Sequence, residues 1–400
     1  MQNLPEKPFT RRSLVLPIYL PACLLSFGGG ILIPTLPLYA KSFDLSLSLI
    51  GLVIAAKDIG ILITDVPAGI LLERIGRKLS MLIGALVVTL STLGMGLASS
   101  FFELILYQFI GGVGTALWTI ARHTYMTDVV PVPERGRSIA LFGGVNRIGT
   151  FLGPAVGGYL GVRYSLRAPF FLCAVIMGIN LFLCFLFIVE TKRPATIGQH
   201  KLPLKQFAAV LKTHHRALTT AGLGQVCVQT LRAGRRIIIP LYGSEVLGLD
   251  VQAVGVIFSI SSAIDMSMFP VAGFIMDRFG RRYATIPCFF IFATGMVMVS
   301  FTRDFTSLLI ATVVMGFGNG LGSGTMMTLG ADLAPKDGTG EFLGAWRLVG
   351  DTGHATGPLI CGNIADVWGL SFSAAALAGI GYVAVAIFLW LVPETLQKPK

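Results

Sequence analysis

Charged side chains are scarce in this sequence. Asp, Glu, Lys and Arg together make up 13% of its 400 residues, whereas 54% are hydrophobic, and the mean hydropathy is +0.76. A soluble globular domain typically has about 25% charged residues. The composition therefore excludes a water-soluble globule and indicates an integral membrane protein.

Several catalytic and energy-coupling motifs are also absent. The chain has no glycine-rich loop ending in Gly-Lys-Ser/Thr, no HExxH and no GxSxG. We therefore expect neither ATP-driven pumping nor hydrolysis, and we expect no enzyme activity and no cofactor. The cysteines lie in apolar segments without metal-type spacing, which indicates packing rather than a metal site. They are Cys23, Cys173, Cys184, Cys227, Cys288 and Cys361.

Long apolar runs fill most of the chain. A membrane-crossing helix needs about 20 apolar residues, because the hydrocarbon core is about 30 Å thick and each helical residue rises about 1.5 Å. Twelve such runs predict an all-α membrane protein with twelve transmembrane helices. They cover approximately residues 14–39, 47–72, 79–99, 101–127, 137–162, 168–189, 217–242, 252–276, 283–301, 305–331, 341–365 and 370–392.

The positive charges are distributed unevenly between the predicted loops. Of the 31 Lys and Arg residues, twenty fall on the side that carries the termini, four on the other side and seven inside spans. Cytoplasmic loops are enriched in Lys and Arg, so both termini are predicted to be cytoplasmic, in a plasma or inner membrane. The net charge of +11 then reflects topology, and no nucleic-acid partner is expected.

One phrase occurs twice along the chain. GILLERIGRK at 69–78 returns as GFIMDRFGRR at 273–282, shifted by 204 residues, and polar landmarks elsewhere keep this shift. We predict two six-helix halves in the same orientation, related by an axis along the membrane normal. The predicted division is an N-terminal half at 1–189, a cytoplasmic linker at 190–216 and a C-terminal half at 217–400.

Three motifs in the chain resemble those of a known family. The first span contains Gly28, Pro34 and Pro37 in a Gly-x5-Pro-x2-Pro pattern. The doubled phrase supplies Gly69, Glu73, Arg74, Gly76 and Arg77, and then Gly273, Asp277, Arg278, Gly280 and Arg281. The fifth span supplies Gly149, Gly153, Pro154, Gly157 and Gly158, and span eleven repeats much of this pattern with Gly353, Gly357, Pro358 and Gly362.

With these motifs the whole chain resembles the major facilitator superfamily, and within it the twelve-span drug:proton antiporter branch. Gln108 departs from the pattern, since the family ties an Arg at that place to proton coupling. The resemblance implies that the doubled loops are cytoplasmic latches that close one state, with Asp65 as a further member. The small residues of spans five and eleven are expected to allow close helix packing at a seam between the halves.

Polar residues recur at helical spacing inside the predicted spans. Such residues are costly in a bilayer and normally face a partner or a water-filled cavity. By resemblance, spans one, four, seven and ten line a central cavity, so these stripes are candidate substrate contacts. They are Gln108, Thr115, Thr119 and Arg122 in span four, Gln225, Gln229, Arg232 and Arg236 in span seven, and Asn319 and Ser323 in span ten.

Acidic residues inside the spans are candidates for proton coupling, because a desolvated carboxylate that loses its cationic partner takes up a proton. Asp58, Asp265 and Asp351 are the three candidates. Asp351 could pair with Arg347 along its own helix or with Arg147 across spans five and eleven.

Three functions are compatible with the sequence. The motifs favour proton-coupled efflux of small, partly hydrophobic organic molecules by a monomer in the lipid bilayer. Seven cations against four aspartates inside the spans favour transport of an organic anion instead, by uptake or exchange. The third reading is a membrane receptor that does not transport.

Overall fold

The computed structural model describes residues 14–191, 213–335 and 338–396, and every regular element in these ranges is helical. Most of the predicted 190–216 linker lies outside the described residues. The first six spans are η2 (Val15–Tyr19) with α1 (Leu20–Lys41), α2 (Leu47–Ile75), α3 (Arg77–Leu97), α4 (Phe101–Val129), α5 (Val132–Arg163) and α6 (Ala168–Phe187). The second set is α8 (His215–Leu241) with η3 (Tyr242–Val246), α9 (Val251–Arg278), α10 (Arg281–Val299), α11 (Phe305–Leu321) with α12 (Thr325–Leu333), and α13 (Thr339–Trp390).

These helices account for the twelve predicted spans. Ten segments of the described chain are long and apolar enough to cross a membrane. The longest, α13, contains two spans, because Gly369 with φ 84° interrupts its helical backbone. The remaining span is α8, whose mean hydropathy is lowered by the arginines at positions 216, 232, 235 and 236. The predicted fold class is confirmed.

The doubled phrase forms two equivalent tight turns. Gly76 joins α2 to α3 with φ 86°, and Gly280 joins α9 to α10 with φ 128°. Only glycine adopts these angles without strain, which explains why both copies keep it. We call the end of the molecule that carries these turns the motif end.

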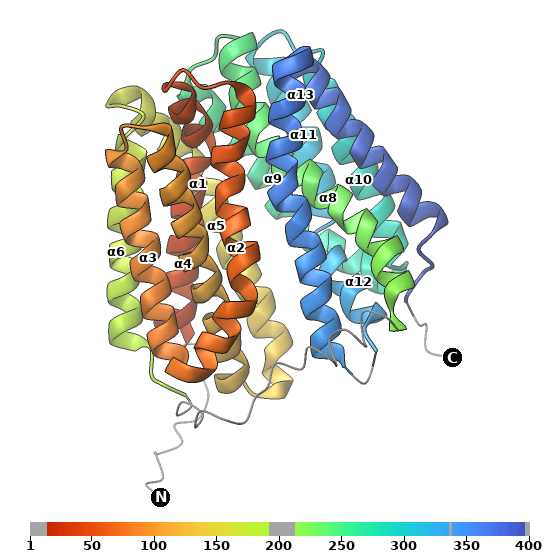
Figure 1. Ribbon diagram of the computed structural model, residues 1–400. Coiled ribbons are helices and arrows are strands. Elements are labelled where there is room, and N and C mark those ends of the chain that lie inside the picture. The colour runs from red at the N-terminus through yellow and green to blue at the C-terminus, as the bar shows by residue number, and fades with distance from the viewer. Residues whose placement is uncertain (1–13, 192–212, 336–337, 397–400) are drawn as a thin grey trace, which may run out of the picture.

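The helices form two groups, α1–α6 and α8–α13, which draw apart toward the motif end (Figure 1). The groups meet where α5 packs on α9 and α2 packs on α13. Gly158 permits the first contact, since a Cβ there would lie 2.6 Å from the Val251 carbonyl oxygen. A Cβ on Gly51 would similarly collide with the carbonyl of Pro358. Gly158 of α5 therefore lies at the seam between the groups, as does Gly362 of α13, where a Cβ would collide with the Leu47 carbonyl oxygen. The expectation is wrong for the other motif glycines, because Gly149, Gly153 and Gly157 pack on α1 and Gly353 and Gly357 pack on α8, within their own groups.

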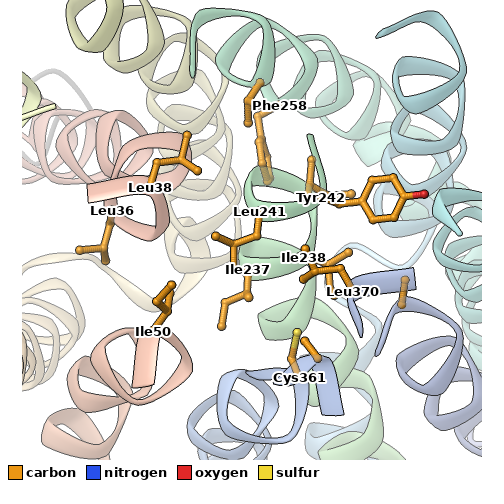
Figure 2. Packing of buried hydrophobic residues seen from close by; sticks show 14 of the residues in the cluster. Leu36, Leu38, Ile50, Ile237, Ile238, Leu241, Tyr242, Phe258, Cys361 and Leu370 are labelled. Atoms are coloured by element: carbon orange, nitrogen blue, oxygen red, sulfur yellow. The ribbon is translucent and has the colours of Figure 1, made fainter. Parts of the chain in front are cut away.

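Buried apolar side chains from both groups close the end opposite the motif end (Figure 2). We call this cluster the seal and this end the sealed end. The seal includes Leu36, Leu38, Ile50, Ile237, Ile238, Leu241, Tyr242, Phe258, Cys361 and Leu370.

A hydrogen-bonded cap reinforces the sealed end. The two carboxylate oxygens of Asp366 on α13 accept hydrogen bonds from the backbone N–H groups of Leu47 (2.7 Å) and Ser48 (2.9 Å). These donors are at the N-terminus of α2, where N–H groups lack partners within the helix and the helix dipole favours a negative charge. The carboxylate of one group thus caps a helix of the other.

Candidate functional site

A cavity of about 270 Å³ lies next to the seal, among α1, α2, α3, α4, α6 and α8. Its wall is mainly apolar, with Leu32, Ile54, Val88 and Met177 among the lining side chains. A mostly apolar cavity with a few polar groups is the usual form of a site for a small organic ligand.

Three charged side chains line this cavity. Lys57 and Asp58 come from α2, and Arg236 comes from α8. Among the described residues none of the three makes an ion pair or a hydrogen bond, and the Arg236 side chain is exposed. Two cations and one acid are therefore available to a ligand. Charges held inside a membrane without a fixed partner indicate a functional site.

The repeat provides an internal comparison for these charges. A shift of 204 residues pairs Lys57 with Ser261, Asp58 with Ser262 and Arg236 with Leu32. The equivalent helices of the two groups therefore pack without a charge at any of the mate positions. Folding alone does not require Lys57, Asp58 and Arg236, which strengthens their assignment to a ligand.

The predicted polar stripe of span four is divided by the structure. Gln108 and Thr115 line the cavity, although the Thr115 hydroxyl also donates to the Gly111 carbonyl at 2.7 Å. Arg122 does not line the cavity: it is buried, with its guanidinium carbon 4.0 Å from the ring centroid of Phe142. Thr119 is partly buried and is not among the cavity residues.

The predicted residues of spans seven and ten form a polar network instead. The Arg232 Nε donates to the side-chain oxygen of Asn319 at 2.8 Å, and the Asn319 amide donates to Asp265 Oδ2 at 2.8 Å. The other oxygen, Asp265 Oδ1, accepts from Arg147 at 2.7 Å. Gln229 also accepts from Arg232, at 3.3 Å. The network thus connects α8, α11 and α9 to α5 of the first group.

Two further members of the predicted stripes lie at the edges of this network. Ser323 accepts a hydrogen bond from Arg147 at 2.6 Å. Gln225 is buried, packs where Gly350 leaves room, and its side-chain oxygen has no partner among the described residues. Neither residue lines the cavity.

A second set of charges crosses between the groups at α2 and α13. Arg347 lies 3.2 Å from Asp65 on α2 and 3.4 Å from Asp351 on its own helix. Of the two partners that the sequence left open for Asp351, the structure shows Arg347, while Arg147 pairs with Asp265. The three candidate coupling acids thus have different surroundings. Asp58 lines the cavity, Asp265 pairs with Arg147 of the other group, and Asp351 pairs with Arg347 of its own helix.

The doubled loops tie α3 and α10 to neighbouring helices of their own group. Glu190 accepts from the backbone N–H groups of Arg77 and Lys78, and the Arg77 side chain pairs with Asp128 at 3.0 Å. In the second copy, Glu394 accepts from the backbone N–H of Arg281 at 2.9 Å. The remaining members are Glu73, Arg74, Asp277 and Arg278, which are exposed, and Gly69 and Gly273, which are partly exposed.

The carboxyl of Glu394 lies outside the predicted spans, and its surroundings change its pKa. Partial burial raises the pKa, but hydrogen bonds from the backbone N–H groups of Leu396, Arg281, Arg282 and Thr395 lower it more. The net pKa is below the ordinary value of 4.5. The ionised form of Glu394 is therefore the one that holds the start of α10.

Sequence reasoning did not assign several polar cavity residues. Lys57 of α2 and Ser91 and Thr92 of α3 line the cavity, but none of them is among the candidate residues predicted from the sequence. The signal for Lys57 was present, because a lysine inside an apolar run is costly and calls for a role. No periodic signal marks Ser91 or Thr92, since isolated hydroxyl residues commonly bond to their own helix.

Twelve spans in two repeated groups, with a partly charged cavity beside their common seal, define a membrane transporter. The family model of the Major Facilitator Superfamily matches residues 18–346 and 221–400. The chain therefore belongs to the Major Facilitator Superfamily.

Known members resemble this chain over different lengths. It is 21% identical to the quinolone resistance protein NorA of Staphylococcus aureus over 354 residues, which cover 88% of this chain and 89% of that protein. It is 30% identical to multidrug resistance protein 2 of Bacillus subtilis over 172 residues, or 43% of each chain. Among solved structures, a bacterial homologue of the human lysosomal transporter Spinster superposes with a TM-score of 0.80 at 16% identity, covering 96% of this chain and 98% of that one.

Proposed function

We propose that the protein exports small, partly hydrophobic organic molecules in exchange for protons. The observation that carries this proposal is Asp58, an acid without a hydrogen bond or ion pair among the described residues, in the wall of an otherwise mainly apolar cavity. Substrate and proton can compete there for one site. The quinolone resistance and multidrug resistance proteins that the chain resembles support export as the direction.

The arrangement of the groups supports alternating access. In the proposed topology the motif end is cytoplasmic, since its loops carry most of the Lys and Arg. The seal then closes the cavity toward the outside, and substrate enters from the cytoplasmic side. Rocking of the groups about the cavity would open the seal and close the motif end, as in other two-repeat carriers.

The coupling step follows from the charges around Asp58. Ionised Asp58 is stabilised by Lys57 and Arg236, which line the same cavity. A substrate that draws these cations away or displaces water leaves the carboxylate less well solvated and favours its protonation. The proton is released when the substrate leaves. Asp265 and Asp351 have another role in this scheme. The ion pair of Asp265 with Arg147 joins the two groups, and Asp351 holds Arg347, which pairs with Asp65 of the other group, so both contacts would change with the state.

Inverted membrane vesicles with an imposed pH gradient provide the test. A fluorescent amine dye, quenched by the gradient, should recover when a transported neutral or cationic compound is added to vesicles with the wild-type protein. Asp58→Asn should abolish this recovery, and Asp304→Asn, which changes an exposed acid in the α10–α11 loop, should not. Full recovery with Asp58→Asn would contradict the assignment of Asp58.

A second candidate, transport of an organic anion, is favoured by Lys57 and Arg236. With Asp58 ionised, the cavity residues carry one net positive charge, which matches a monoanion with an apolar body. In the same vesicles, recovery with 2-naphthoate but not with 2-naphthamide or a naphthylmethyl ammonium would establish this function. Recovery with the amide and the ammonium compound would exclude it as the main function.

A further inference from the structure

We infer that the outer face of α3 and α6 holds one anionic phospholipid of the cytoplasmic leaflet, with an acyl chain between the helices and its phosphate at Lys78. The inference concerns the lipid-facing surface and does not rest on the identity of the transported compound.

The site for the acyl chain is an apolar groove. It is lined by Leu79, Leu82, Ile83 and Leu86 of α3 and by Gly178, Leu181, Phe182 and Phe185 of α6. Its side chains are open to the surroundings, with Phe182 60% exposed and Leu79 47% exposed. From Leu79 to Leu86 the groove follows α3 for about 10 Å, at about 1.5 Å per residue. This is about two thirds of one leaflet of a core about 30 Å thick.

Gly178 creates the space in this groove. A Cβ at Gly178 would meet no atom within 4 Å, so the backbone there borders open space. The glycine is not required by the backbone, because it lies within the regular helix α6 and is not among the glycines with positive φ. What it provides is room beside α3.

The equivalent surface of the second group is filled. A shift of 204 residues pairs Gly178 with Tyr382 and Leu86 with Phe290. The rings of Tyr382 and Phe290 contact each other with centroids 5.6 Å apart, and the Tyr382 hydroxyl lies 3.0 Å from Thr294 Oγ1. The same fold can therefore close this surface with its own side chains, and the first group leaves it open.

A cation is available at the motif end of the groove. The ammonium of Lys78 lies 5.6 Å from the ring centroid of Phe185, and it has no carboxylate within ion-pair distance among the described residues. Its repeat mate Arg282 is occupied, since its guanidinium donates to the carbonyl of Leu389, the mate of Phe185. The first group thus leaves both the groove and the cation open to a ligand. In the second group, aromatic side chains fill the equivalent surface and the equivalent cation is hydrogen-bonded to the protein's own backbone.

Charge complementarity identifies the occupant. In the proposed topology the motif end is at the level of the cytoplasmic headgroups, where anionic lipids are attracted to basic residues. An ammonium at the end of an apolar groove matches a phosphate that is followed by an acyl chain. A headgroup with net negative charge is favoured over a zwitterionic one. In a zwitterionic lipid the ammonium of the headgroup would compete with Lys78 for the lipid's phosphate.

Native mass spectrometry of the purified full chain provides the test. The protein is equilibrated with equal amounts of phosphatidylglycerol and phosphatidylethanolamine that have identical acyl chains. We expect one retained lipid, with phosphatidylglycerol favoured by about fivefold. Lys78→Gln should keep a lipid but lose the preference, and Gly178→Tyr with Leu86→Phe should lose the lipid. Val175→Tyr, on the exposed surface of α6 outside the groove, is the matched control and should behave as wild type.

A variant that should gain a lipid serves as a second test, because misfolding could explain the loss of a lipid but not the gain of one. Tyr382→Gly with Phe290→Leu should open the second surface and add a second lipid without a headgroup preference, since Arg282 remains bonded to Leu389. Equal retention by the wild type and by the Gly178→Tyr, Leu86→Phe variant would overturn the inference. So would displacement of the lipid by a transported compound, which would make the groove an entrance for substrate.

Discussion

Arg147 of α5 lies 2.7 Å from the carboxylate of Asp265 on α9, and this ion pair joins the two groups of helices. Both side chains are partly buried, at 22% and 17% exposure. Asp265 also accepts from Asn319, so that both of its oxygens are occupied. The pair therefore belongs to the state in which the seal is closed.

Removal of either partner should destabilise this state. We expect Arg147→Gln and Asp265→Asn each to lower the melting temperature of the purified protein, because each leaves a partly buried charge without its partner. The double variant should lose less stability than the two single variants lose together. The difference, which is the coupling free energy of the pair, should be at least about 1 kcal/mol. Additive effects in this double-mutant cycle would show that the pair contributes little.

Arg232 and Arg236 should differ in their effect on substrate charge. Arg236 lines the cavity and is exposed there, whereas Arg232 is bonded to Asn319 and Gln229. Arg236→Gln should weaken binding of 2-naphthoate by about tenfold, or about 1.4 kcal/mol, and leave 2-naphthamide unchanged. Arg232→Gln should affect both compounds equally. Tryptophan quenching titrations would measure both, and a charge-selective loss in Arg232→Gln would contradict this division.

A methyl group at Gly158 should disturb the seal. Because its Cβ would lie 2.6 Å from the Val251 carbonyl, Gly158→Ala should cost about 1–3 kcal/mol in the sealed state and shift the protein toward the opposite state. Gly143→Ala on the same helix is the control, since a Cβ there meets nothing within 4 Å. The readout is maleimide labelling of a cysteine placed at Ile50. Equal labelling in the two variants would show that the α5–α9 contact adapts.

Acid should loosen the start of α10 through Glu394. Its pKa is below 4.5 in the folded protein, so its stabilising effect is complete above pH 4.5 and is lost as the pH falls through the folded pKa. Glu394→Gln should lower the melting temperature at pH 7, with a cost of about 1 kcal/mol as for other lost helix caps. The variant should also lose less stability than wild type between pH 5 and pH 3. If the melting temperatures of the variant and the wild type fell by the same amount between pH 5 and pH 3, this role of Glu394 would be contradicted.

The fold was largely predictable because its determinants are repeated along the chain. Apolar length defines the spans, and the shift of 204 residues defines the two groups. One span, α8, is too polar for a hydropathy criterion. It was nevertheless among the twelve apolar runs predicted to cross the membrane, at residues 217–242.

The candidate site was less predictable, because helical spacing places residues on one face but does not say what that face meets. Arg122 shares a stripe with Gln108, yet it packs on Phe142, while Gln108 reaches the cavity. Similarly, Asp265 and Arg147 are 118 residues apart, and nothing in either local sequence identifies the other as its partner. Such pairings depend on how the two groups dock.

The composition of the seal gives transport a characteristic dependence on temperature. Opening this end exposes mainly apolar side chains, and hydration of apolar surface has a large positive heat capacity. The free-energy difference between the two states therefore depends non-linearly on temperature. Cooling weakens the apolar contribution that keeps the seal closed. An Arrhenius plot of transport through this protein should bend, even where a single step limits the rate.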